Sequence, residues 1–259
     1  MLHEPDDQGD DLEERPTSSE LLLANASTAQ NRRQKLSTLD KRRISQLFSV
    51  SQLCIIAVVI FIGVWQGHDG GFEWATKSNH FHKFFQPCAF AALQGLAILS
   101  YRSFFNRPKL QVKWAHATLH ATALALGWTG FVAELRYKDQ NGYQHFVSIH
   151  SWLGLAVLAG YSLQFLFGVC TFALSCTGHR LRARMLPPHR YVGLVLFAIS
   201  CVQIVGGLVA YGSLTQAECK GLSTLCTYQI LVNLATLGVI VYAVLVLHVL
   251  LTEKYKRTE

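Results

Sequence analysis

The chain has 259 residues, of which 51% are hydrophobic and only 15% are charged, with a net charge of +7 at neutral pH. A soluble globular domain carries about 25% charged residues, so this composition excludes one, and it also excludes a disordered chain and a small disulfide scaffold. The charges lie in short clusters between long uncharged stretches. The basic balance therefore indicates the orientation of a membrane protein, and no basic patch predicts binding of nucleic acid.

The chain begins with an arm, residues 1–45, which is rich in Asp, Glu, Ser, Thr and Asn over most of its length. The arm shows no hydrophobic periodicity, and such a segment cannot bury enough apolar surface to fold by itself. The sequence therefore predicts a disordered arm, which the orientation of the later segments places in the cytosol.

Six uncharged stretches then follow, each about as long as the roughly 20 residues that a transmembrane helix needs. They cover residues 47–66, 84–101, 114–133, 149–175, 191–217 and 227–252. Strands of a membrane barrel would be about ten residues long and would alternate polar with apolar residues, which these stretches do not. The sequence predicts an all-α, polytopic membrane domain over residues 46–252, a bundle of six helices, followed by a cytosolic tail at 253–259.

The orientation follows from the positions of Lys and Arg, which are enriched in cytosolic loops. Six precede the first stretch at residues 32–43, four lie at 102–113, four at 180–190 and three at 254–257. These seventeen lie on one side, whereas only five lie on the other, at positions 77, 83, 136, 138 and 220. We therefore expect both termini in the cytosol.

Four histidines recur at intervals of one membrane crossing plus a loop. His82, His116, His150 and His189 are separated by 34, 34 and 39 residues and lie near the starts of the second to fifth helices. Because successive helices run in opposite directions, His82 and His150 are expected at the non-cytosolic face, and His116 and His189 at the cytosolic face. Ionisable side chains in membrane helices are rare and usually functional.

Each pair could hold one flat ligand. Gly154 and Gly193 follow His150 and His189 by four residues, on the same helix face. These glycines remove bulk beside the imidazoles, which favours a porphyrin over simple hydrogen bonding between helices. Two axial histidines leave no open position on a haem iron, so such a haem transfers single electrons. The pattern predicts two b-type haems between the second to fifth helices. His120, one turn beyond His116, is an alternative ligand.

Several of these segments together resemble the cytochrome b561 family. The resemblance covers roughly residues 47–252 and is most specific at 94–102, 113–116, 148–154 and 188–193. It implies a six-helix membrane protein with two haems that takes electrons from cytosolic ascorbate. It also implies an acceptor across the membrane, either monodehydroascorbate or ferric iron as a chelate, and so an ascorbate-dependent reductase or ferrireductase.

Two positions depart from the family pattern. The family usually has Pro after the histidine of the second helix, whereas this chain has Lys83 after His82. Many members also carry a His in the loop before the fourth helix, at a place that resembles part of the non-cytosolic substrate site. This chain has Lys138 there, with His145 nearby, so either its acceptor differs from the usual one or the site is built differently.

The cytosolic site needs cations, because ascorbate is an anion at neutral pH. Lys109 and Lys113 precede His116, and Arg182 and Arg184 precede His189. In the family, the two lysine positions resemble ascorbate contacts, so all four residues are candidate substrate contacts. The alternative is that they only hold the loops on the cytosolic side.

Other hypotheses about function fit parts of the same pattern. A haem-binding membrane sensor or subunit without ascorbate turnover is the main alternative. A metal transporter is disfavoured, because the six stretches contain no carboxylate. The sequence leaves open a homodimer and a disulfide between Cys219 and Cys226. It also leaves open the membrane: endosomal or lysosomal, secretory-vesicle or plasma membrane.

Overall fold

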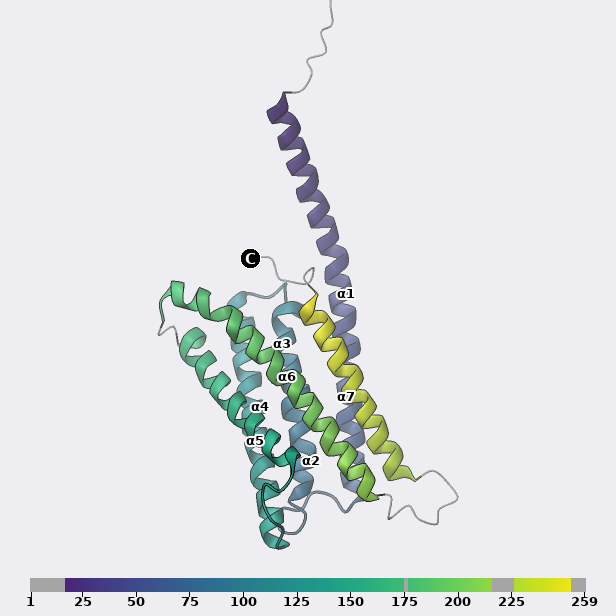
Figure 1. Ribbon diagram of the computed structural model, residues 1–259. Coiled ribbons are helices and arrows are strands. Elements are labelled where there is room, and N and C mark those ends of the chain that lie inside the picture. Colours follow the sequence, from purple (N-terminus) through teal and green to yellow (C-terminus); the bar gives the residue numbers. More distant parts are fainter. Residues whose placement is uncertain (1–16, 175–176, 216–225, 253–259) are drawn as a thin grey trace, which may run out of the picture. The chain divides into compact units, whose positions relative to one another are not determined.

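The computed structural model describes residues 17–174, 177–215 and 226–252, and every regular element in these ranges is helical (Figure 1). In chain order the elements are α1 (Ser18–His68), α2 (Asn79–Pro87), the π-helical turn η1 (Cys88–Leu93), α3 (Gln94–Ser103), α4 (Lys109–Gln140), α5 (Ile149–Gly168), the π-helical turn η2 (Val169–Ala173), α6 (His179–Thr215) and α7 (Thr227–Leu251). The prediction of an all-α protein is confirmed.

The N-terminal arm differs from the prediction. The chain divides into two units, Met1–Arg42 and Arg43–Glu259, and α1 is helical from Ser18 on, whereas disorder was expected as far as residue 45. Residues 18–62 contain neither Gly nor Pro and are rich in Leu, Ala, Gln, Lys and Arg. These residue types favour a helix even where no side chain is buried. The remainder of the arm, residues 1–16, lies outside the described residues.

Five helical segments are long and apolar enough to cross a membrane. They are Thr38–His68, Asn79–Ser103, Ile149–Ala173, His179–Tyr211 and Thr227–Leu251. Each contains or overlaps one of the predicted stretches. The remaining stretch, residues 114–133, lies inside the 32-residue helix α4, which is less apolar because His116, His120 and several threonines interrupt it. The structure thus confirms five of the six predicted membrane helices by length and composition.

The second membrane segment is one rod made of three elements. Pro87 lies at the end of α2 and has no N–H to donate to the preceding turn. The π-helical turn η1 follows at once and continues directly into α3. A π-helical turn contains more residues than an α-helical one and occurs often at functional sites. The turn therefore changes which side chains of α3 face the neighbouring helices.

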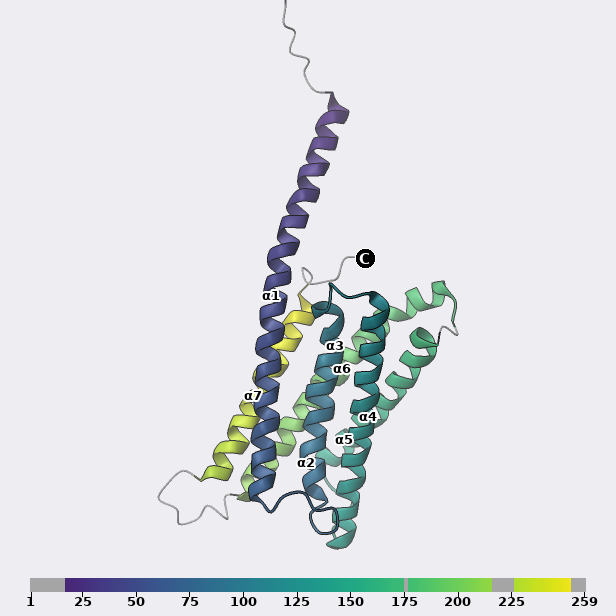
Figure 2. The same cartoon turned by 180° about the vertical axis from the view of Figure 1, so that it is seen from behind.

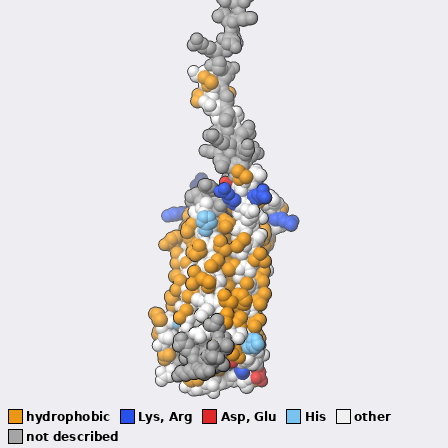
Figure 3. Space-filling model, turned by 90° about the vertical axis from the view of Figure 1, so that its right-hand side faces the viewer, with side chains coloured by type: hydrophobic (Ala, Val, Ile, Leu, Met, Phe, Trp, Pro, Cys, Tyr) orange, Lys and Arg blue, Asp and Glu red, His pale blue; other side chains and the backbone are white. Residues whose placement is uncertain are grey.

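Within the unit Arg43–Glu259, α4 packs against α2, α3 and α5, while α6 packs against α5 and α7. Figures 1 and 2 show that α2 and α5 begin at one end of this bundle and that α4 and α6 begin at the other. Figure 3 shows hydrophobic side chains over the middle of the bundle, with most of the visible Lys and Arg side chains near one end. Side chains near the starts of α2 and α5 can therefore meet at one end, and those near the starts of α4 and α6 at the other.

The contact between α1 and α7 gives a direct test of this packing. A Cβ at Gly238 would overlap Cγ2 of the buried Val58, and overpacking of this kind costs about 1–3 kcal/mol. We expect Gly238→Ala to lower the melting temperature in detergent. The double variant Gly238→Ala/Val58→Ala should recover part of this loss, because it removes the overlapping methyl group.

The matched control is Gly206→Ala, whose added Cβ would meet no atom within 4 Å. Thermal unfolding of the parent protein and these three variants, followed by circular dichroism, measures the effect. A Gly238→Ala variant as stable as the Gly206→Ala control would show that α1 and α7 do not pack in this way.

Candidate cofactor site

His82 and His150 face each other across one end of the bundle. Their ring centroids lie 6.5 Å apart, with the ring planes at 76°. His82 is in the first turns of α2, and His150 is in the first turn of α5, which Ser148 caps by accepting a hydrogen bond from the Ser151 N–H at 3.2 Å. The cap fixes the start of α5 and therefore the place of His150. The structure brings together the first predicted pair.

The spacing of this pair fits two axial ligands of one metal. A metal–imidazole nitrogen bond is about 2.0–2.1 Å, so two imidazoles on opposite sides of one ion have centroids ~6.3 Å apart. The observed 6.5 Å is close to this value. A direct hydrogen bond between the two rings would bring their centroids closer together. The geometry therefore fits a pair that holds a metal between its rings.

The hydrogen bond on the far side of His82 leaves the correct nitrogen free. Its Nδ1 lies 3.2 Å from the Gly130 carbonyl oxygen of α4. A carbonyl can only accept, so Nδ1 carries the proton, and Nε2 keeps its lone pair for a metal. Nδ1 of His150 is buried and has no hydrogen-bond partner among the described residues. The carbonyl of His150 accepts a hydrogen bond from Gln203 Nε2 at 2.7 Å.

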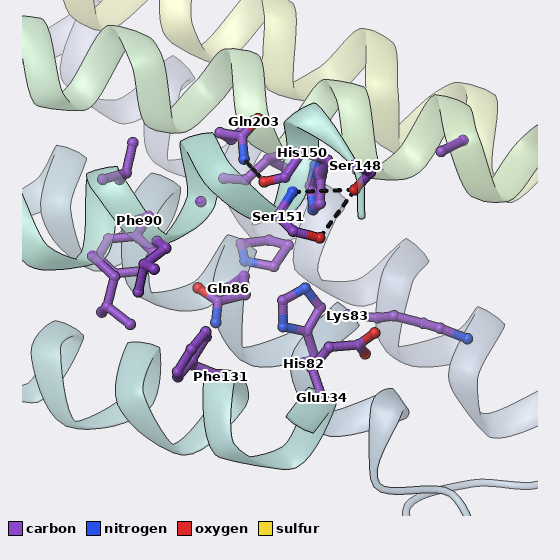
Figure 4. A pocket seen from close by; sticks show the side chains of 18 of the residues that line it. His82, Lys83, Gln86, Phe90, Phe131, Glu134, Ser148, His150, Ser151 and Gln203 are labelled. Carbon is purple, nitrogen blue, oxygen red and sulfur yellow. Dashed lines mark hydrogen bonds between the residues drawn. The ribbon is translucent and has the colours of Figure 1, made fainter. Parts of the chain in front are cut away.

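The two rings open into a cavity of about 390 Å³, within the range of cofactor sites. Figure 4 shows His82 and His150 directed into this space, with Phe90 and Phe131 to one side and Lys83 extending away from the rings. Toward the bundle the lining is apolar, whereas near the loop between α4 and α5 it is polar. The polar lining includes Glu134, Lys138, His145, Ser148 and Ser151. An amphipathic ligand such as haem, apolar with carboxylates at one edge, fits these walls.

His116 lies at the other end of the bundle, near the start of α4. Its Nδ1 is 2.8 Å from the Ala97 carbonyl oxygen of α3, so this ring also keeps Nε2 free to bind a metal. His120 is next to it, with ring centroids 4.4 Å apart, and its Nδ1 lies 2.5 Å from the Tyr161 hydroxyl. A hydroxyl can donate or accept, so this contact does not fix the tautomer of His120. The hydrogen bonds therefore favour His116 over His120 as the ligand.

His189, the expected partner of His116, lies in α6 directly after Pro187 and Pro188. Like His116, it lies near the start of its helix, and α4 and α6 begin at the same end of the bundle (Figure 1). Gln164 Nε2 of α5 donates to its Nδ1 at 2.9 Å and to its carbonyl oxygen at 2.7 Å. Binding of a metal through Nε2 requires a proton on Nδ1, and so requires the amide oxygen of Gln164 against the ring. The side-chain amide of Gln164 must therefore turn over before His189 can bind a metal through Nε2.

Two glycines that the sequence did not single out lie against the histidine rings. A Cβ at Gly207 of α6 would meet His150 Cε1 at 3.1 Å, and one at Gly168 of α5 would meet His189 Cε1 at 3.2 Å. The predicted Gly154 instead faces Gln203, at 3.2 Å from a would-be Cβ. Each ring therefore packs on a glycine of the opposite helix and not on the glycine that follows it by four residues.

A repeat in the sequence could have identified these residues. The pattern His, then Gly after four residues, Gln after fourteen and Gly after eighteen occurs twice. It gives 150, 154, 164 and 168 in α5, and 189, 193, 203 and 207 in α6. Because the two helices are antiparallel neighbours, the Gln and the second Gly of each one meet the His of the other. The repeat is thus the signal for both glutamines and both glycines.

The predicted cations occupy different surroundings. Lys138 lines the cavity of His82 and His150 together with His145. Lys109 and Arg184 are exposed, and Lys113 and Arg182 are half-buried. Among the described residues, no hydrogen bond or ion pair joins the four cytosolic candidates to His116 or His189. Of the two loop cysteines, Cys226 is disulfide-bonded, and Cys219 lies outside the described residues.

Comparison with known proteins gives a consistent result. The family described as eukaryotic cytochrome b561 matches residues 81–213. The chain is 32% identical to the transmembrane ascorbate-dependent reductase CYB561 of Ovis aries over 209 residues, which cover 80% of this chain and 82% of that protein. It is 28% identical to the lysosomal membrane ascorbate-dependent ferrireductase CYB561A3 of Mus musculus over 219 residues, 82% and 89% of the two chains.

A third relative is the plasma membrane ascorbate-dependent reductase CYBRD1 of Xenopus tropicalis, 31% identical over 217 residues that cover 82% of this chain and 76% of that protein. The residues matched by the family model include all four histidines of the two pairs, at positions 82, 116, 150 and 189. The family match spans half of the chain, and the relatives align with most of it. The chain belongs to the cytochrome b561 family.

Proposed function

We propose that the chain carries single electrons across a membrane, from ascorbate in the cytosol to monodehydroascorbate or a ferric chelate on the other side. Two b-type haems are the carriers, one held by His116 and His189 and the other by His82 and His150. Relatives named as ascorbate-dependent reductases and as a ferrireductase support the reaction class. The position of one histidine pair near each end of the bundle supports the path of the electron across the membrane.

The observation that carries this proposal is the 6.5 Å between the rings of His82 and His150 across a cavity with apolar inner walls. A haem held by two histidines has no open coordination position and supplies one-electron transfer. The residues of the chain orient the imidazoles, through the carbonyls of Gly130 and Ala97.

The membrane topology completes the proposal. We propose that α4 is the sixth membrane helix, because it packs against α2, α3 and α5, which belong to two of the five apolar segments. Polar side chains in a membrane helix are tolerated where they face the bundle interior, and His116 and His120 do so by contacting α3 and α5. The excess of Lys and Arg on one side supports this topology with both termini in the cytosol.

A haem-binding sensor without turnover is the alternative from another class. It would have the same histidine pairs, so the geometry alone does not separate the two. Complete reduction of the purified protein by ascorbate, followed by reoxidation with a ferric chelate, supports the reductase. A protein that binds haem but that ascorbate leaves oxidised would be the sensor.

The first functional prediction concerns the ligands. We expect the parent protein to bind about two haems per chain, both six-coordinate and low-spin. His150→Leu should lose the haem at its end, giving a ratio of about one, while ascorbate still reduces the other. The exposed His179 lies in α6 outside both pairs, so His179→Leu is the matched control and should keep both haems.

Haem content by pyridine haemochrome and the visible spectrum before and after ascorbate measure this outcome. An unchanged haem ratio in His150→Leu would exclude His150 as a ligand.

The second prediction concerns the ascorbate site. Lys113 lies three residues before His116 in α4, and Lys109 lies one further turn away. Removing the Lys113 ammonium group should weaken binding of the ascorbate anion about tenfold in apparent affinity, and Lys109→Ala should have a smaller effect. Lys113→Arg keeps the charge and is the matched control. Salt should screen the effect, because the site is open to water.

Stopped-flow reduction at varied ascorbate concentration separates the variants. Reduction of Lys113→Ala at the parent rate at every concentration would mean that the lysines only set topology.

The third prediction concerns orientation. Asn25, Ala26 and Ser27 form a glycosylation sequon that should stay unmodified, because the arm remains in the cytosol. In sealed vesicles that expose the non-cytosolic face, an impermeant maleimide should label Gln144→Cys in the loop after α4. It should not label Ala183→Cys near the start of α6, which is equally exposed. A glycan on Asn25, or the reverse labelling pattern, would invert the assignment of the two faces.

A further inference from the structure

A continuous row of aromatic rings crosses the middle of the bundle between the two histidine pairs. The ring of His116 is followed by that of His120 at a centroid distance of 4.4 Å, then by Tyr161 at 5.6 Å and by Phe90 at 5.1 Å. Phe90 in turn lines the cavity into which His82 and His150 point (Figure 4). We name these four residues, His116, His120, Tyr161 and Phe90, the ring row.

The ring row is fixed in a dry interior. Tyr161 and Phe90 are only 2% and 5% exposed, and the Tyr161 hydroxyl lies 2.5 Å from Nδ1 of His120. The distances between the rings fall in the range of ordinary aromatic pairs, so no step of the row is a gap. Closely packed side chains of this kind keep one arrangement on the time average.

Two local features of the backbone make room for the row. Phe90 belongs to the π-helical turn η1, and a Cβ at Gly127 of α4 would meet the end of the Phe90 ring at 2.5 Å. Only a residue without a side chain lets this ring cross α4 toward Tyr161 of α5. Among the described residues, the rings of Phe167 and Phe172 beside His189 form ring pairs with each other and with His189, and with no further ring that leads toward the second pair.

We propose that the ring row is the path by which the electron passes from one histidine pair to the other, and that Tyr161 is its central positioning residue. This inference rests on the proposed function. The rate of electron tunnelling falls steeply with each empty gap between donor and acceptor, and falls less through packed atoms. The ring of Tyr161 closes the gap between His120 and Phe90.

The step is balanced without any bond being made or broken. One electron leaves the centre held by His116 and His189, which is oxidised by one unit, and arrives at the centre held by His82 and His150, which is reduced by one unit. The rings of the row keep all their electrons and protons before and after the transfer. No further oxidant or reductant is needed beyond those of the proposed reaction.

The test uses pulse radiolysis of the purified full chain with both haems bound, without ascorbate or acceptor. The pulse delivers less than one electron per chain, and the rate at which that electron redistributes between the two haems is recorded. We expect Tyr161→Leu to slow this redistribution several-fold, because the ring is lost. Tyr161→Phe, which keeps the ring, should remain close to the parent rate.

Tyr242 supplies the matched control, because it is also a fully buried tyrosine, packed against Phe197 outside the ring row. Tyr242→Leu should therefore leave the redistribution rate unchanged. Spectroelectrochemical titration of each variant gives the two reduction potentials, which should match those of the parent. A slower rate with unchanged potentials identifies a change of path, whereas a general structural defect would shift the potentials.

A parent rate in Tyr161→Leu, with both haems bound, would overturn the proposal. If that variant does not keep both haems, Phe90→Leu is measured in its place, with slowing again expected, and a parent rate there overturns the proposal equally. Failure of the proposed function gives a different result: the parent chain would then lack two haems or would resist reduction by ascorbate.

Discussion

A buried histidine that is to bind a metal must present one particular nitrogen, and this requirement governs the arrangement of the bundle. In water either nitrogen can carry the proton, but inside a membrane the choice is made by the hydrogen bond on the far side of the ring. The carbonyls of Gly130 and Ala97 make that choice for His82 and His116. Both carbonyls belong to neighbouring helices, so the position of each ligand depends on the packing of two helices and not on its own helix alone.

The same requirement accounts for an approximate internal symmetry. Ala97 follows His82 by fifteen residues and accepts from His116, while Gly130 follows His116 by fourteen and accepts from His82. The rod formed by α2, η1 and α3 and the helix α4 thus exchange equivalent hydrogen bonds. The longer interval contains the π-helical turn η1, which accommodates an additional residue in a helix of about the same rise. Helices α5 and α6 make a second reciprocal exchange, in which the amide of Gln203 donates to the His150 carbonyl and that of Gln164 donates to the His189 carbonyl.

The sequence was sufficient for the features that follow from the length and the direction of each helix. Runs without charge predicted the five apolar helices, and the alternation of helix direction predicted that His82 and His150 would meet. The contacts of Gly168, Gly207 and Tyr161 were not predicted, because they depend on how each helix is rotated about its axis against its neighbour. A hydrophobic run contains no information on that rotation, although the repeated spacing of His, Gly and Gln does.

Composition averaged over a whole segment misled in the N-terminal arm. The arm is polar overall, yet its residues individually favour a helix and α1 begins at Ser18. Conversely, α4 is less apolar than the other long helices of the bundle because it carries His116 and His120 toward the interior. A helix surrounded by α2, α3 and α5 exposes less of its surface to lipid than one at the rim. It can therefore hold the polar residues that a lipid-facing helix cannot, and low hydropathy in such a helix indicates where the chemistry is located.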